Sequence, residues 1–457
     1  MLKETLRLLM DILSQPAVLV ALISLIGLMI QKKPVSEVVK GTTKSFLGFI
    51  VISAGAGILV GSLEPFGKMF EEAFNVNGVV PNNEAIVAMA LSKFGSNTAL
   101  IMFFGMLANI LIARFTSLKY IFLTGHHTLY MACMIAVILA VAGMEGAMLV
   151  IIGSIALGLI MAFFPALAQP FMKKITGTDQ VGFGHFSTLG YILSGYIGKL
   201  VGKKSKSTEE INFPKGLAFL RDSSVSIALT MTILYVIVAL FTGPTFIEAE
   251  LSGGTHYLVY SVIQAVTFAA GVFVILAGVR LVLAEIVPAF KGISNKLVPN
   301  AKPALDCPIV FPYAPNAVLI GFFSSFLGGI VGMAFLGMVG GIIILPGVVP
   351  HFFTGATAGV FGNSTGGIKG ATIGSFFNGL LITFLPVFLM PVLGDLGFAN
   401  TTFSDADFGA TGILLGNVAN SFGSTGVIIT VLVSLIVAVA WNVIRKNKPV
   451  DRTKISA

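Results

Sequence analysis

Long apolar runs separated by short polar segments dominate the chain. Ten runs are candidates for membrane-spanning helices, because a spanning helix needs about 20 predominantly apolar residues. Their ranges are 16–31, 44–62, 99–114, 120–142, 146–165, 224–242, 256–284, 317–346, 371–392 and 425–444. Five further apolar segments are too short or too rich in glycine to span simply, and we expect re-entrant or broken helices at 85–95, 181–198, 308–316, 350–365 and 408–423. The pattern predicts an all-α integral membrane protein.

Composition supports a membrane location for the whole chain, residues 1–457. It is 56% hydrophobic and 11% charged, whereas a soluble domain carries about 25% charged residues. The mean hydropathy is +0.96. Cys133 and Cys307 lie in or beside apolar segments, which gives no disulfide framework and no metal-binding spacing. The amphipathic start "MLKETLRLLMDILSQP" is expected to lie along the membrane surface.

The charged loops predict an orientation. Net charge is +8, and the basic residues fall in short loops between apolar runs, as the positive-inside rule requires of cytoplasmic loops. This placement argues against a nucleic-acid partner. The segments 243–255 and 394–407 carry acids and no bases, so we expect them on the outer face. An outer N-terminus and an inner C-terminus imply an odd number of crossings, and we predict about 11 transmembrane helices.

The two halves of the chain repeat each other. The segment "GFIVISAGAGILVGSLEPF" (48–66) aligns with "GVFVILAGVRLVLAEIVPAF" (271–290), and four further blocks follow in the same order with similar shifts. The predicted halves are 44–200 and 267–423. An odd number of spans between them makes the repeat inverted. Inverted repeats with interrupted helices are typical of secondary transporters, which bind substrate near the bilayer midplane.

Ionisable residues inside apolar segments are candidate site residues, because burying each one in a membrane costs roughly 2.5–3.5 kcal/mol on insertion scales. They are Glu84, His126, His127, His185, Glu285, Asp306 and Lys369. The adjacent histidines follow Thr124-Gly125, and a helix would point their rings about 100° apart. One of them can therefore bind a ligand while the other bonds to a loop carbonyl.

His185 and Asp306 lie in irregular apolar segments. His185 is in "GFGHFSTLG", either a hairpin tip at a site or a solvated turn. Asp306 is in "PALDCPIVFPYAPNA", where three prolines prevent a regular helix, and it is either a site residue or a helix N-cap. Glu84 matches Asp306 in the repeat. Glu285 is expected to pair with Arg280.

The sequence contains no catalytic constellation. There is no Ser/His/Asp spacing, phosphate-binding loop or HExxH motif, and neither cysteine has a basic neighbour that would mark a phosphoryl acceptor. We therefore expect no catalytic residues, no metal and no cofactor. Lys369 is expected to extend its amine to the membrane interface.

Several motifs together resemble a known family. They are "KGTTKSFLGFIVISAGAGIL", "FLTGHH", "GVRLVLAEIVPAFKGIS", "DCPIVFPYAPNAV" and "IILPGVVPHFFTGATAGVFGN". The chain resembles the ascorbate-specific enzyme IIC, the membrane permease component of the bacterial phosphoenolpyruvate:sugar phosphotransferase system. The resemblance implies a homodimer in the inner membrane, with a V-shaped dimerisation part and a core that moves in an elevator-like manner. A separate cytosolic IIB protein phosphorylates the sugar, and the basic loop 199–221 is a candidate surface for docking it.

The resemblance also implies a set of ligand positions. They are Asn83, Glu84, His126 and His127 with Tyr130, His185 with Phe186, and Asp306. The family pattern has Thr-Tyr where this chain has Asn83-Glu84, and Gln where it has Tyr130 and Phe186. The expected substrate is L-ascorbate or a related sugar or polyol.

Two alternatives stay open at this point. L-Ascorbate is an anion at neutral pH and acids would repel it, unless they are protonated or offset by a protonated histidine. Otherwise the acids bind hydroxyls of a neutral sugar or polyol. The second alternative is an ion-coupled secondary transporter of a small polar solute, with Asp306 or Glu84 carrying the proton.

Overall fold

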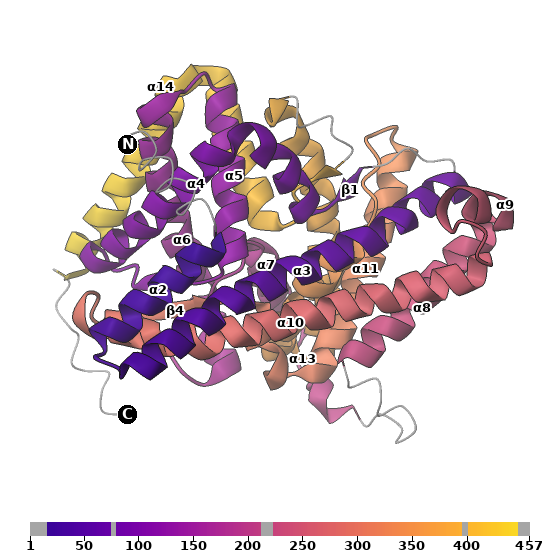
Figure 1. The fold of residues 1–457 in the computed structure, drawn as a ribbon, viewed down its shortest axis with the longest axis horizontal. Coiled ribbons are helices and arrows are strands. Elements are labelled where there is room, and N and C mark those ends of the chain that lie inside the picture. The colour runs from indigo at the N-terminus through magenta and orange to yellow at the C-terminus, as the bar shows by residue number, and fades with distance from the viewer. Residues whose placement is uncertain (1–15, 75–78, 212–222, 395–400, 447–457) are drawn as a thin grey trace.

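The computed structural model describes residues 16–74, 79–211, 223–394 and 401–446, which are mostly helical (Figure 1). The predicted surface helix at the N-terminus and the end of the basic loop 199–221 lie outside the described residues. The side chains of Glu84, Arg280 and Glu285 also lie outside them, so the Glu285–Arg280 pair stays a prediction.

One group of helices consists of α2 (Pro16–Ile30), α3 (Val35–Phe74), α8 (Ser223–Thr242) and α10 (Tyr257–Lys296). Helices α3 and α10, both 40 residues long, lie side by side (Figure 1). The buried side chains of Met69, Tyr235 and Phe268 pack between α3, α8 and α10. These apolar contacts hold α3, α8 and α10 together, and α2 packs against α3 and α10.

A second group surrounds the candidate site. Its helices are α4 (Asn83–Phe115), α5 (Gly125–Val141), α6 (Gly146–Thr176), α7 (Thr188–Val201), α11 (Pro315–Met338), α13 (Ala356–Leu389) and α14 (Ala406–Lys446). After its first turn, which carries His126 and His127, helix α5 is apolar on all sides, and its residues from Met131 to Leu139 are at most 1% exposed. A helix that is apolar all round belongs in the interior of a bundle. Helices α4, α6 and α14 enclose α5 and shield it from lipid.

Short elements complete the fold. They are α9 (Pro244–Phe246), α12 (Val348–Pro350), the 3₁₀ turns η1 (Thr208–Glu210), η4 (Cys307–Ile309), η5 (Phe311–Tyr313) and η7 (Met390–Val392), and the π-helices η3 (Ile247–Leu251) and η6 (His351–Gly355). The 3₁₀ turns η4 and η5 confirm the irregular segment predicted at 308–316. Pro308 and Pro312 account for it, because proline removes a backbone donor from a helix.

Glycines interrupt two of the long helices. Gly367 in α13 and Gly423 in α14 have φ angles of 57° and 62°, in the left-handed region that favours glycine. The breaks separate 350–365 from 371–392 and 408–423 from 425–444, which confirms that both short segments belong to broken helices. The prediction was wrong for 85–95, which is part of the continuous helix α4.

Two small parallel sheets join the halves of the chain. In the first, β4 (Lys302–Leu305) lies between β2 (Tyr120–Phe122) and β3 (Gly182–Phe183). In the second, β1 (Val80–Pro81) pairs with β5 (Thr401–Thr402), and Val79 bridges to Ile344. In the first sheet the central strand β4 comes from the second half of the chain and its two neighbours from the first half, and in the second sheet β1 of the first half pairs with β5 of the second half.

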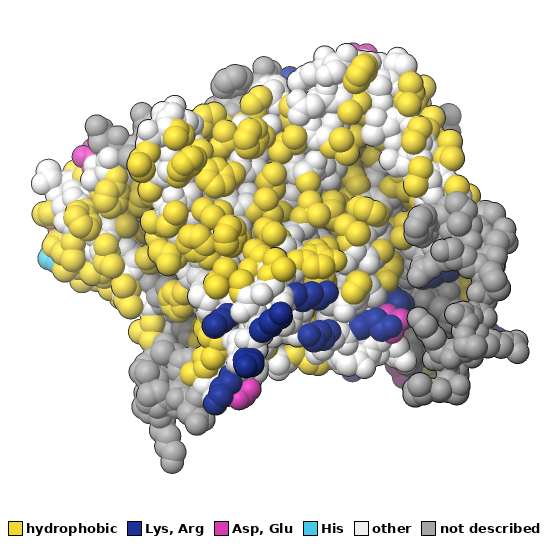
Figure 2. Space-filling view, turned by 180° about the vertical axis from the view of Figure 1, so that it is seen from behind, with side chains coloured by type: hydrophobic (Ala, Val, Ile, Leu, Met, Phe, Trp, Pro, Cys, Tyr) yellow, Lys and Arg dark blue, Asp and Glu magenta, His cyan; other side chains and the backbone are white. Residues whose placement is uncertain are grey.

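Within the described residues, five helices are long and apolar enough to cross a membrane. They are Lys93–Phe115, Gly146–Thr176, Pro315–Met338, His351–Val392 and Ala406–Ala440. A sixth candidate is the pair Met231–Thr242 and Pro244–Leu251, bent by 100°. Figure 2 shows a broad apolar surface bordered by a row of Lys and Arg side chains, as expected where lipid gives way to water. The count of 11 crossings stays a prediction.

Outside the membrane-spanning segments, Asp179 in the loop before β3 forms an ion pair with Lys302 at the start of β4. Its carboxylate accepts hydrogen bonds from Lys302 Nζ at 2.6 Å and Gln169 Nε2 at 2.8 Å, and Lys173 Nζ is 3.3 Å away. The Lys302 ammonium is the main reason why the pKa of Asp179 falls to about 2. The carboxylate therefore stays ionised at every physiological pH.

We expect Asp179→Asn to lower thermal stability slightly at neutral pH. Because the native pKa lies below the unfolded value, the stabilisation is present above the unfolded pKa and disappears as pH falls toward 2. The side chain is 46% exposed, so solvent screening limits the loss to about 1 kcal/mol or less. Thermal unfolding in detergent from pH 7 to pH 2.5 should show the two proteins converging. A difference that is constant with pH would contradict this role.

Candidate functional site

The first sheet brings three predicted residues together. His126 lies four residues after β2, His185 two residues after β3, and Asp306 directly after β4. Because the strands are parallel, their carboxyl ends meet at one edge, and the residues that follow them converge there. The second sheet delivers Asn83 after β1 and Asp405 after β5 to the same place.

Imidazoles and carboxylates alternate through the cluster. His126 Nε2 is 3.7 Å from Asp306 Oδ2, and Asp306 Oδ1 is 3.9 Å from His185 Nε2. On the other side of its ring, His185 Nδ1 is 3.7 Å from Asp405 Oδ2, which is 3.9 Å from His127 Nε2. The side chains of His126 and Asp306 are 20% and 12% exposed, and the other three are 4–5% exposed. An incoming ligand therefore meets His126 and Asp306 first.

Both adjacent histidines belong to the cluster, although the sequence favoured a site role for one. Their rings are 4.7 Å apart, and each faces a different aspartate. His127 Nδ1 accepts a hydrogen bond from the backbone N–H of Phe186 at 3.3 Å. An accepting Nδ1 carries no proton, so we assign His127 as the neutral Nε2–H tautomer. Its remaining N–H points toward Asp405.

His185 is held from both sides rather than exposed in a turn. The Tyr191 hydroxyl lies 2.7 Å from His185 Nδ1, and the His127 ring is 3.8 Å away between centroids. Its segment is a buried strand followed by the start of α7, so the alternative of a solvated turn is wrong. Asp306 is both a cluster residue and an N-cap, because its Oδ1 accepts from the Cys307 backbone N–H at 2.7 Å.

Asp405 and Asp407 are site residues that the sequence analysis missed. Their segment, 394–407, was expected on the outer surface because it is acidic, yet Asp405 is 4% exposed and Asp407 is fully buried. Asp405 Oδ1 accepts from Asn83 Nδ2 at 3.2 Å and from Ser404 Oγ at 2.6 Å. The repeat carried the missing signal, because its last block aligns "FGH" at 183–185 with "FGA" at 408–410, directly after Asp407.

Asp407 caps a helix from a distant part of the chain. Its two carboxylate oxygens accept from the backbone N–H groups of Thr188 and Leu189 at 2.8 and 2.9 Å. These groups form the first turn of α7, where unpaired N–H groups and the helix dipole stabilise an anion. Asp407 therefore fixes the segment carrying His185 against the start of α14.

The remaining predicted residues surround the cluster. Tyr130 is one turn after His126, with 5.8 Å between ring centroids. The buried Phe186 ring stacks on Phe122 at 4.5 Å, so it packs in the core behind the histidines. Asn83 positions Asp405. Glu84 begins α4 beside Asn83, but its side chain lies outside the described residues.

The cluster also contains donor sets that resemble metal sites. Within the described residues, three groups have donor atoms within 4.8 Å of one another: His126–His127–Asp306, His127–His185–Asp405 and His185–Asp306–Cys307. A metal-bound histidine normally donates its second ring N–H, whereas His127 accepts at Nδ1. That hydrogen bond disfavours the two groups containing His127 and does not bear on His185–Asp306–Cys307.

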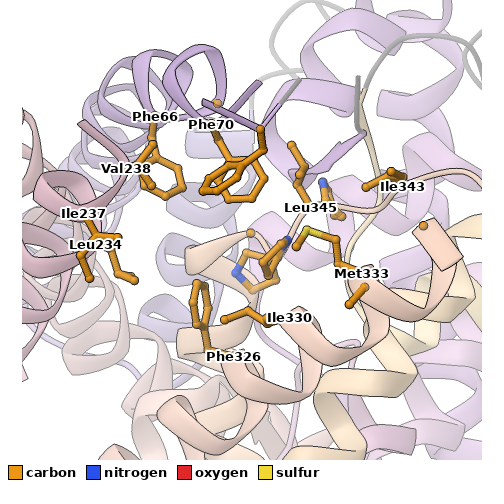
Figure 3. A pocket seen from close by; sticks show the side chains of 18 residues that line it. Phe66, Phe70, Leu234, Ile237, Val238, Phe326, Ile330, Met333, Ile343 and Leu345 are labelled. Atoms are coloured by element: carbon orange, nitrogen blue, oxygen red, sulfur yellow. The ribbon is translucent and has the colours of Figure 1, made fainter. Parts of the chain in front are cut away.

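A separate apolar cavity of about 590 Å³ lies between the two groups of helices (Figure 3). Phe66, Phe70 and Val238 line it from α3 and α8, and Phe326 and Met333 line it from α11. None of its lining residues belongs to the histidine–aspartate cluster, and none is charged. Such a lining offers little to a hydroxylated ligand, so this cavity is a poor candidate for the polar site.

The sequence of the chain is similar to a known protein family and to a named relative. The family model described as "PTS system sugar-specific permease component" matches residues 11–407. A Mycoplasma pneumoniae protein (strain ATCC 29342 / M129 / Subtype 1) named "Ascorbate-specific PTS system EIIC component" is 26% identical over 416 residues. The match covers 79% of this chain and 63% of that relative, so the chain spans less than two thirds of the relative's length.

Proposed function

The chain belongs to the family of PTS system sugar-specific permease components, and from this premise we propose that it binds L-ascorbate or a related sugar or polyol. The family and the apolar helices make it a multi-pass protein of the cytoplasmic membrane. In our proposal the chain carries substrate inward, and a separate cytosolic IIB protein phosphorylates it. The permease itself then performs no phosphoryl transfer.

The buried cluster of three histidines and two aspartates is the observation that carries this proposal. Its imidazoles and carboxylates supply both donors and acceptors, which a polyhydroxylated ligand requires. Buried ionisable groups in membrane proteins usually face a substrate pathway. We assign substrate binding to His126, His185 and Asp306, with His127, Tyr130 and Asn83 beside them, and we retain Glu84 and Phe186 as proposed positions.

We further propose that 44–200 and 267–423 are inverted repeats. Helix α10 begins and ends 222 positions after α3, at Tyr257 and Lys296 against Val35 and Phe74. The sheets follow the same shift, since Lys302 in β4 lies 222 positions after Val80 in β1. Strand exchange between the halves supports a binding site at their interface.

The two groups of helices suggest two structural parts with different roles, one in dimerisation and one in substrate transport. We propose that α2, α3, α8 and α10 form the V-shaped dimerisation part of a homodimer. The second group, which holds the cluster, would form a core that moves in an elevator-like manner. Oligomeric state in detergent, measured by light scattering, tests the dimer.

A transport assay tests the function directly. Vesicles containing the purified chain and loaded with phosphorylated IIB protein are expected to accumulate a phosphorylated product from labelled L-ascorbate or a labelled hexitol. Vesicles loaded with unphosphorylated IIB serve as the control and should accumulate at least about tenfold less product. The reason is that phosphorylation traps the substrate.

Two results would contradict the proposal. Accumulation of unmodified substrate that collapses when a protonophore is added would indicate an ion-coupled secondary transporter. Uptake that is independent of phosphorylated IIB and only equilibrates the substrate would indicate a facilitator.

A further inference from the structure

We propose that His185, Asp306 and Cys307 form a binding site for one Zn²⁺ ion, and that the bound ion excludes the substrate. One donor atom of each residue lies within 4.8 Å of the donor atoms of the other two. The residues follow the ends of the paired strands β3 and β4, so the sequence shows no metal-binding spacing. The competition with substrate rests on the proposed function, because His185 and Asp306 are also assigned to substrate, whereas the metal site itself does not.

The three donor types select a class of metal ion. A thiolate, an imidazole nitrogen and a carboxylate oxygen are the ligands that Zn²⁺ takes in proteins, in tetrahedral geometry. Mg²⁺ and Ca²⁺ take oxygen ligands instead. The charges of one thiolate and one carboxylate neutralise the ion, so the complex can be buried without a net charge. Three protein ligands leave the fourth position to water, as in open zinc sites.

His185 has the second hydrogen bond that a histidine ligand requires. Its Nδ1 lies 2.7 Å from the Tyr191 hydroxyl and 3.7 Å from Asp405 Oδ2, whereas its Nε2 lies 3.9 Å from Asp306 Oδ1. The Tyr191 oxygen can accept from Nδ1–H, which leaves the lone pair of Nε2 for the ion. His127 differs, because its Nδ1 accepts from a backbone N–H that can only donate.

Tyr191 also supports the cysteine ligand. Its oxygen lies 3.7 Å from Cys307 Sγ, within reach of a hydrogen bond to sulfur. A hydroxyl that accepts from His185 still has its own proton to donate, and a charged thiolate accepts more strongly than a neutral thiol. Tyr191 is fully buried. One tyrosine therefore holds both the imidazole and the sulfur in the protonation states that bind a metal ion.

Asp306 completes the set and lies where an ion would enter. Its Oδ1 accepts from the Cys307 backbone N–H at 2.7 Å, and carboxylates that bind metals are themselves hydrogen-bonded. The side chain of Asp306 is 12% exposed, that of His185 is 5% exposed, and Cys307 is fully buried. An arriving ion therefore meets the carboxylate first. The Zn–S bond forms as the thiol releases its proton to solvent and the ion releases bound water.

Metal titrations of the purified full chain test the site. Calorimetry with Zn²⁺ is expected to show about one ion bound per chain and about one proton released, measured by comparing buffers of different ionisation enthalpy. Mg²⁺ should not bind, because a sulfur and a nitrogen replace the oxygen ligands it needs. Co²⁺ in place of Zn²⁺ should give the near-ultraviolet charge-transfer absorption of a cobalt–thiolate bond.

Three variants locate the ion. Cys307→Ser should remove the cobalt–thiolate absorption and weaken Zn²⁺ binding at least about 100-fold, more than the loss of a supporting partner costs. Tyr191→Phe should weaken Zn²⁺ binding about 10- to 100-fold, because it removes the partner of two ligands. Cys133→Ser, at the other cysteine and within α5, is the matched control and should keep both the affinity and the absorption.

The vesicle assay with phosphorylated IIB inside measures competition with substrate. Saturating Zn²⁺ outside the vesicles should lower product formation by the wild-type chain at least about tenfold, because one site cannot hold both ligands. A chelator should restore it. Cys307→Ser vesicles, compared with their own rate without metal, should resist the same Zn²⁺ concentration.

The outcomes separate the metal site from the proposed function. Absence of Zn²⁺ binding, Zn²⁺ affinity unchanged in Cys307→Ser, or a wild-type Co²⁺ complex without thiolate absorption would overturn the site, and the last result does not depend on how any variant folds. Product formed in vesicles would still support the permease. Zn²⁺ bound at full occupancy without effect on uptake would overturn the exclusion of substrate. A lack of product even without Zn²⁺ would contradict the proposed function, while calorimetry would still decide the metal site.

Discussion

Replacing His185 by alanine is expected to abolish substrate binding, lowering affinity by at least about 100-fold, or about 2.7 kcal/mol. The ring of His185 lies between Asp306 and Asp405, within 3.9 Å of each. Its removal takes away the imidazole between the two carboxylates and leaves the Tyr191 hydroxyl without its 2.7 Å partner. The variant therefore loses both a ligand contact and the arrangement of the acids around it.

Binding is measured by calorimetry with the ligand that the wild-type chain prefers, and folding by thermal unfolding in detergent. His256→Ala is the matched control, because His256 is exposed and remote from the cluster in sequence. The control should retain wild-type affinity. A folded His185→Ala protein with unchanged affinity would remove the cluster from the substrate site.

Part of the site was predictable because burial of a polar group is expensive. His126, His185 and Asp306 stood out as ionisable residues in apolar surroundings, and the structure places them within one cluster. Asp405 and Asp407 did not stand out, because an acidic segment is usually a solvated loop. Their stabilising partners, Asn83 and the N-terminus of α7, are 322 and 219 positions away. The residues next to Asp405 and Asp407 in the sequence do not indicate that these distant partners exist.

The fold shows the same limit. Hydropathy located the helices because lipid demands long apolar runs, and glycine located the breaks in α13 and α14. The strands could not be found this way, since β1, β3 and β5 have two residues each and pair with segments far along the chain. Such short strands show no periodicity, yet they are what aligns His185 with Asp306.

Close contact between glycines makes α13 sensitive to any added side chain. Gly359 of α13 is buried against α11, where a Cβ atom would collide with the carbonyl oxygen of Ala317 and approach Gly321. Small residues at crossings let membrane helices approach closely. The obstacle is backbone, which cannot rotate away as a side chain can, so the helices must separate.

We therefore expect Gly359→Val to destabilise the protein by about 3 kcal/mol or more. Because α11 begins at Pro315, shortly after Asp306, separation of the helices should also displace that carboxylate and weaken ligand binding. Thermal unfolding in detergent, with and without ligand, measures both effects. The control is Gly95→Val, since a Cβ at Gly95 in α4 meets nothing within 4 Å. Equal unfolding temperatures for the two variants would show that α11 and α13 can separate at little cost in stability. The α11–α13 contact would then not be what holds the Asp306 carboxylate in position.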